Sequence, residues 1–114
     1  MYGRLRRYGL WGELHEESEL FAIEAKQLTN TNPKQSKELY AQAARKEEET
    51  INLIFPTMPI ICESFIISTA ALYFKAGDSA ESRRIIAEHK DKIKSHYYIT
   101  LLEEMVNRLD EHSK

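Results

Sequence analysis

The sequence predicts an all-α fold of about five antiparallel helices, arranged as an array of helical hairpins or as an irregular bundle. The 114 residues include only four glycines and three prolines, fewer than a turn-rich β fold would need. Apolar residues recur three and four positions apart, at helical spacing, between short segments that contain helix breakers. With 42% hydrophobic and 30% charged residues, the chain is expected to fold as one domain.

The first two expected helices are separated by a turn that contains asparagine and proline. Apolar spacing predicts a helix over residues 17–29, and the segment 30–33 ends it. Asn32 before Pro33 is typical of a helix start, with Asn as the cap and Pro at the first helical position. The second helix is expected over residues 33–55. Five successive charged residues in this helix are expected to share a solvated face: Arg45, Lys46, Glu47, Glu48 and Glu49.

The other three expected helices follow a second proline-containing break, residues 55–59. The third covers residues 60–76, is apolar on nearly every side and ends at Gly77. A run of this length is too long for a strand. A fourth helix is expected over residues 80–92, and Ser95 opens a fifth. Short connections between helices favour antiparallel neighbours.

The chain is expected to divide into an N-terminal arm, residues 1–16, and a single helical domain, residues 17–114. The arm combines basic and aromatic residues: Arg4, Arg6, Arg7, Tyr2, Tyr8 and Trp11. The three arginines could contact an anionic partner such as RNA or DNA. The alternative is an arm folded against the body. A net charge of −2 excludes a strongly basic nucleic-acid binder.

Residues 63–96 contain a large, a small and an aromatic residue, then a turn, then a small and a large residue. The motif reads Ile66-x2-Thr69-Ala70-x2-Tyr73, then Gly77-Asp78, then Ser82-x3-Ile86. This spacing resembles a tetratricopeptide repeat, and residues 17–50 resemble a weaker copy. Thr69, Ser82 and His89 depart from the residue types usual in the family. The resemblance implies stacked helical hairpins whose first helices line a concave face, with the fifth helix as a cap.

The residues that could carry chemistry form no catalytic or metal-binding pattern. Cys62 is the only cysteine, which excludes an internal disulfide and a cysteine-rich zinc site. The segment His15-Glu16-x-x-Glu19 lacks the second histidine of a helical zinc motif, so it is expected to be a solvated acidic helix start. Nothing local supports Cys62 with His89 or His96 as nucleophile and base. We therefore expect no metal and no cofactor, and the sequence favours a protein that is not an enzyme.

Because the third helix is apolar all round, one row of its side chains is left over after it packs against the second and fourth helices. This row consists of Ile60, Ser64, Ile67, Ala71 and Phe74. Either the fifth helix covers the row or a partner protein does, and a homodimer is the favoured form of the second case. The predicted function is a small protein-interaction module, a scaffold or adaptor. The alternatives are an accessory nucleic-acid-associated protein that uses the Arg-rich arm, and a small helical enzyme or enzyme subunit.

Two features of the sequence bear on the compartment. The basic start is not followed by the roughly 7–15 apolar residues that a secretory signal contains. The longest apolar stretch, residues 60–74, is shorter than the roughly 20 residues of a membrane span. A cytoplasmic protein without membrane contact is therefore expected.

Overall fold

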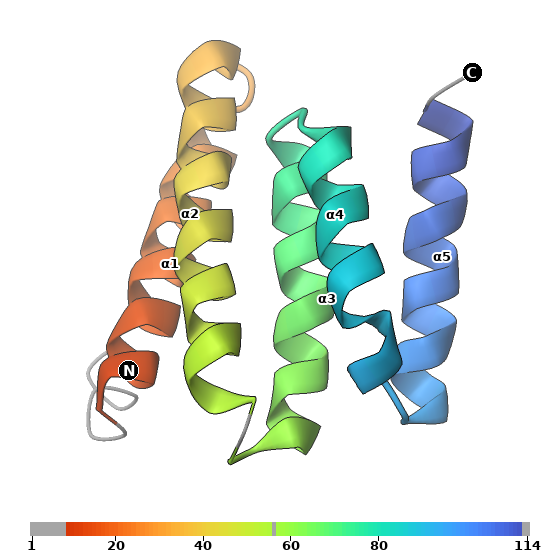
Figure 1. Ribbon diagram of the computed structural model, residues 1–114. Helices are drawn as coiled ribbons and strands as arrows, with labels where there is room; N and C mark the ends of the chain where they lie inside the picture. The colour runs from red at the N-terminus through yellow and green to blue at the C-terminus, as the bar shows by residue number, and fades with distance from the viewer. Residues whose placement is uncertain (1–8, 56, 113–114) are drawn as a thin grey trace.

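Five α-helices run alternately up and down and form two helical hairpins followed by a single helix (Figure 1). They are α1 (Leu10–Leu28), α2 (Pro33–Ile54), α3 (Pro59–Lys75), α4 (Ser79–His89) and α5 (His96–His112), and a short 3-10 segment, η2 (Lys90–Lys92), follows α4. The computed structural model describes residues 9–55 and 57–112, and this part of the chain contains no strand. The predicted all-α class with five helices is confirmed.

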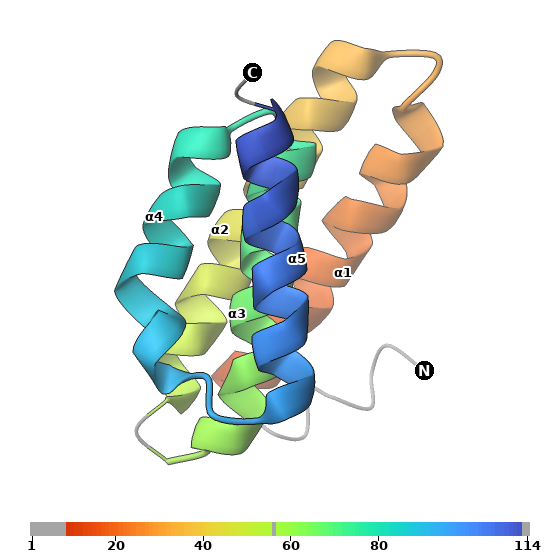
Figure 2. The ribbon, with the colours of Figure 1, turned by 90° about the vertical axis from the view of Figure 1, so that its right-hand side faces the viewer.

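The third helix lies at the centre of the array (Figures 1 and 2). It packs against α2, α4 and α5, while α1 packs mainly against α2. The α3 side chains Cys62, Ile66, Thr69 and Tyr73 are buried. Because α3 is apolar on nearly every side, it requires neighbours on several sides at once, and this requirement places it in the middle.

The predicted breaks between helices are confirmed at the second and fourth helix starts. The side chain of Asn32 accepts a hydrogen bond from the backbone N–H of Gln35 at 3.3 Å. Asp78 does the same for Glu81 at 3.1 Å. Gly77 follows α3 with φ +81°, a conformation that glycine adopts at little cost.

The first helix starts seven residues earlier than predicted, at Leu10 rather than at residue 17. Gly9 has φ +85°, so the chain enters the helix through a conformation that favours glycine. Leu14 and Ser18 are buried, which shows that the first turns of α1 already belong to the packed body. The predicted arm therefore loses residues 10–16 to the helix, and residues 1–8 lie outside the described part of the chain.

Both hairpins are held by the same contact between a serine and a small residue. In the first hairpin, Ser36 Oγ donates to the carbonyl oxygen of Ala25 at 2.6 Å. In the second, Ser82 Oγ donates to the carbonyl oxygen of Ala70 at 2.8 Å. Both alanines are completely buried, and a methyl side chain lets the two helix backbones of each hairpin approach closely. The serine at position 82, which departs from the usual repeat residue, thus has a structural role in this chain.

Enlarging the small side chain at this contact is expected to destabilise the second hairpin. Ala70→Leu inserts three carbon atoms where α3 and α4 touch, and we expect it to lower the free energy of unfolding by about 1–3 kcal/mol or more. Urea denaturation followed by circular dichroism measures the change. Ala80→Leu is the matched control, because Ala80 is exposed on α4 and should tolerate leucine within about 0.5 kcal/mol. Equal stability of the two variants would show that the helices are not in close contact at Ala70.

Candidate functional site

The row predicted as a partner surface runs along α3, and α5 covers most of it. Ile67 and Ala71 line a shallow hollow of about 150 Å³ together with residues of α5. The ring of Phe74 meets the ring of His112 edge-on, with 5.3 Å between their centres. Ser64 is half-buried, and Ile60 is the member of the row that is strongly exposed. The sequence predicts that either the fifth helix or a partner protein packs on this row, and in the structure α5 packs on it.

Exposed large apolar side chains gather at one end of the array, at the bottom of Figure 1, where α1 starts, α2 meets α3 and α5 starts. We call this region the apolar end, and its members with their exposed fractions are Leu10 (58%), Leu53 (47%), Ile60 (76%), Ile61 (43%) and Tyr97 (66%). Among the described residues, only three other large apolar side chains are exposed. At the opposite end, the turns at residues 29–32 and 76–78 contain no such side chain. Gathered apolar side chains of this kind are typical of interaction surfaces.

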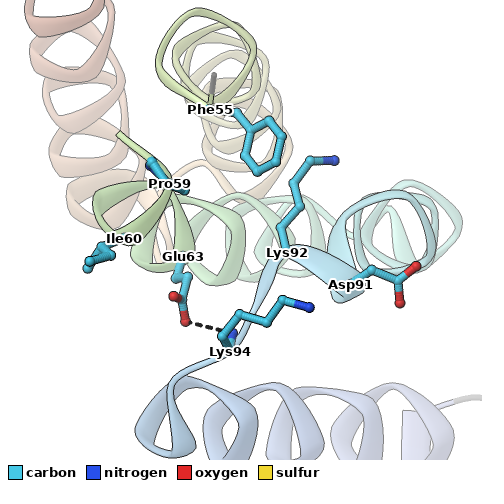
Figure 3. A pocket seen from close by; sticks show the side chains of 7 residues that line it. All are labelled: Phe55, Pro59, Ile60, Glu63, Asp91, Lys92 and Lys94. Carbon is cyan, nitrogen blue, oxygen red and sulfur yellow. Dashed lines mark hydrogen bonds between the residues drawn. The ribbon is translucent and has the colours of Figure 1, made fainter. Parts of the chain in front are cut away.

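A pocket of about 480 Å³ opens in the apolar end, between the α2–α3 connection and the segment that joins η2 to α5 (Figure 3). Phe55, Pro59 and Ile60 form its apolar wall. Lys92 extends along the ring of Phe55, with Nζ 4.7 Å from the ring centre and 3.0 Å from Nδ1 of His89. The pocket therefore offers room for an apolar side chain beside positively charged residues.

Glu63 lines the same pocket and fixes the start of α5. Its Oε1 atom accepts the backbone N–H groups of Lys94 at 3.1 Å and of Ser95 at 3.0 Å, the first of which is dashed in Figure 3. Burial would raise the pKa of Glu63, but the hydrogen bonds from Ser95 and Lys94 outweigh it and hold the pKa below its ordinary value. The carboxylate is thus engaged by the chain itself and positions one wall of the pocket.

A second hollow, of about 380 Å³, lies on the α1 and α2 side of the apolar end. Leu10, Leu14 and Leu53 line it together with Glu49 and Asn52. Of the residues in this region, only Ile60 belongs to the partner surface that the sequence predicts. A usable signal was present, because apolar residues flank both prolines in the segment 53–61, where a connecting loop is normally polar.

Polar side chains from three helices meet around His15, which lies on α1. Its Nδ1 atom is 2.7 Å from Oε1 of Glu47 on α2, and its Nε2 atom is 2.9 Å from Oε1 of Glu19. Ser68 on α3 donates to the other oxygen of Glu47 at 3.3 Å, and the ring of Phe65 packs 4.7 Å from the imidazole. Glu47 is only 2% exposed. The predicted solvated helix start at His15 is therefore wrong, and so is the predicted solvated position of Glu47.

The geometry around His15 favours a structural role over a catalytic one. Burial would lower the pKa of His15, but Glu47 and Glu19 together raise it above its ordinary value. Burial also raises the pKa of Glu47, in spite of the nearby imidazole. An imidazole that faces a carboxylate at each nitrogen can donate to both only when it is protonated. Because Ser68 is bonded to Glu47 and not to the imidazole, the pair of nucleophile and base needed for covalent catalysis is not formed.

Glu48 also departs from the predicted solvated face, because it belongs to an ion-pair network between α2 and α4. Arg84 Nη2 lies 2.9 Å from Glu48 Oε1, and Arg84 also pairs with Glu81 and Glu88 on its own helix. The hydroxyl of Tyr73 donates to Glu48 at 2.9 Å. Burial would raise the pKa of Glu48, but the bonds from Arg84 and Tyr73 hold it below its ordinary value. This network joins the two hairpins on the side away from α1.

The remaining candidate residues are placed as follows. Cys62 is fully buried, and burial raises the pKa of its thiol to about 11, which disfavours the reactive thiolate. Within the described residues, no three side chains of the types that bind metals lie close enough together to hold an ion. None of the described helices has the length and apolarity required to cross a bilayer. Arg4, Arg6 and Arg7, the candidate contacts to an anionic partner, lie outside the described residues.

The contacts of His15 predict that stability falls as the pH rises. The pKa of His15 is raised in the folded state, so its stabilising contribution is complete below the unfolded value of 6.5 and is lost above the folded value. We expect His15→Gln to lower the free energy of unfolding by about 1–2 kcal/mol near pH 6, with a smaller difference near pH 9. Urea denaturation at both pH values measures this. His96→Gln, at an exposed position on α5, is the control. If the loss of unfolding free energy caused by His15→Gln grew with pH, the stabilising role of the protonated His15 would be contradicted.

Comparison with known proteins finds no relative of this chain. No family model matches the chain, and no curated protein and no solved structure matches it. The similarity to tetratricopeptide repeats therefore stays a prediction.

Proposed function

We propose that this chain is a protein-interaction module that binds a partner protein through its apolar end. The observation that carries the proposal is the gathering of Leu10, Leu53, Ile60, Ile61 and Tyr97 at one end of the array. Each of these side chains extends from the start or the end of a helix, and together they come from α1, α2, α3 and α5. Complete burial of a leucine or isoleucine side chain contributes about 1.5–3 kcal/mol of favourable free energy. Binding of a partner that buries these side chains is therefore favoured.

The shape of the apolar end favours a protein over a small polar substrate. Its pocket of about 480 Å³ has an apolar wall, and the carboxylate of Glu63 inside it is already bonded to the backbone of Lys94 and Ser95. A catalytic pocket would place several unengaged polar groups around one reacting atom. Central apolar anchors beside a polar rim are instead the arrangement found in protein interfaces.

Site-specific photo-crosslinking in the cell that produces the protein tests this proposal. A benzophenone side chain placed at Ile60 is expected to yield a discrete covalent adduct with a protein. The same side chain at Lys34, which is exposed at the opposite end of the array, should yield none. Absence of an adduct at position 60, or the same adduct from both positions, would contradict a specific interface at the apolar end.

A second variant separates loss of contact from loss of folding. Ile60→Asp removes the most exposed member of the apolar end, so the free energy of unfolding should change by no more than about 0.5 kcal/mol. With the benzophenone moved to Leu53, Ile60→Asp is expected to reduce the adduct by about tenfold. An unchanged yield from a folded variant would remove Ile60 from the interface.

A further inference from the structure

The charges on the two sides of the apolar end are of opposite sign. On the side of α1 and α2, Glu13 lies in the first turn of α1, and Glu49 lines the hollow together with Leu10 and Leu53. On the side of η2 and α5, three lysines occur within five residues: Lys90, Lys92 and Lys94, with Asp91 among them. We call these the acidic flank and the basic flank. The start of α3, which carries the exposed Ile60 and Ile61, lies between the start of α1 and the start of α5 (Figure 1).

We propose that the occupant of the apolar end is a second copy of this chain, joined end to end by a two-fold axis. The inference rests on the proposed function and names its partner. A second copy turned by 180° in the plane of Figure 1 presents its apolar end to the first. In this arrangement the acidic flank of each copy faces the basic flank of the other, and the isoleucines of both copies meet at the axis. The surface is thus complementary to itself, as a closed two-fold interface requires.

Electrostatic complementarity selects this orientation over others. A copy turned by 180° about a horizontal axis in the plane of Figure 1 would also present its apolar end, but it would place acidic flank against acidic flank and basic against basic, which like-charge repulsion disfavours. Of the flank residues, Glu49, Lys90 and Lys94 are exposed and therefore available to a partner copy. Lys92 is half-buried, and its amine is engaged by His89 and Phe55.

The size of the interface implies a weak dimer. The molecule measures 38 × 30 × 19 Å, so one of its ends offers only a small contact area. Specific interfaces bury about 1,200–2,000 Å² in total, and this contact would lie at the lower limit. We therefore expect dissociation in the micromolar range, where the mass in solution changes with concentration.

Reversal of charge on one flank at a time tests both the partner and its orientation. The acid-to-base variant carries Glu49→Lys with Asn52→Lys, and the base-to-acid variant carries Lys90→Glu with Lys94→Glu. Sedimentation equilibrium of the natural chain should show a species of twice 13.3 kDa at about 200 μM. Each variant alone should dissociate at least about tenfold more easily, because both symmetric contacts become like-charged. An equimolar mixture of the two variants should recover the affinity of the natural chain.

Recovery in the mixture also shows that both variants are folded, so a loss in each variant alone cannot be attributed to unfolding. Lys26→Glu with Lys34→Glu, two exposed positions at the opposite end, is the matched charge control and should not change association. A chain without residues 1–8 is expected to associate as the natural chain does. Loss of association there would assign the contact to the N-terminal segment and overturn the proposal.

The remaining outcomes separate this inference from the proposed function. A natural chain that stays monomeric at every concentration, while crosslinking from Ile60 captures a different protein, overturns the dimer and leaves the interaction module intact. A monomer with no adduct overturns both. Cosedimentation of the monomer with vesicles of phosphatidylglycerol would assign the apolar end to a lipid surface and would equally overturn the dimer. Association that the charge variants neither weaken nor recover would show that the copies meet in another orientation.

Discussion

The constraint on which the structure depends is the apolar circumference of α3. A helix with one apolar stripe needs one neighbour, whereas α3 needs cover on several sides, and the chain supplies it from α2, α4 and α5. At the middle of the helix, Ile66 and Ala70 are fully buried and Ile67 and Ala71 are half-buried. The cover fails at the start, where Ile60 and Ile61 extend beyond the surrounding helices. The candidate interface is therefore the part of α3 that this chain alone does not cover.

The paired serine contacts show how two unrelated stretches of sequence reach the same local geometry. Ala25 and Ala70 allow close approach of the helices in each hairpin, and the hydroxyls of Ser36 and Ser82 then reach the carbonyls opposite. A carbonyl in a helix has a second lone pair, so it can accept the hydroxyl and keep its own helical bond. Such a contact stabilises a narrow spacing between helices without requiring a large apolar side chain. It accounts for the departure of residue 82 from the repeat pattern in physical terms.

Local signals in the sequence predicted most of the fold, and contacts between distant residues account for what they missed. The breaks at Asn32, Pro59 and Gly77 depend on backbone chemistry within a few residues, so the helices they bound could be predicted. The burial of Glu47 depends on His15, which is 32 positions away, and no local pattern indicates that pairing. A run of three glutamates is normally solvated, so the local sequence predicts an exposed Glu47. Ile60 is the one residue of the predicted row that belongs to the apolar end, because exposure at a helix end depends on where neighbouring helices stop.

The apolar end and the row beneath α5 illustrate two ways of covering the same helix. Along the row, α5 packs on Ile67 and Ala71, and its start is fixed by the bonds from Glu63 to the backbone of Lys94 and Ser95. This cover belongs to the chain and has a fixed position, so the row is not available to a partner while α5 is in place. The apolar end has no such cover among the described helices, since α5 starts beside the start of α3 and runs along α3 away from this end (Figures 1 and 2). The hydrogen bonds from Lys94 and Ser95 to Glu63 hold the start of α5 in place. The same bonds therefore fix the edge of the apolar end, so the buried Glu63 determines where this surface begins.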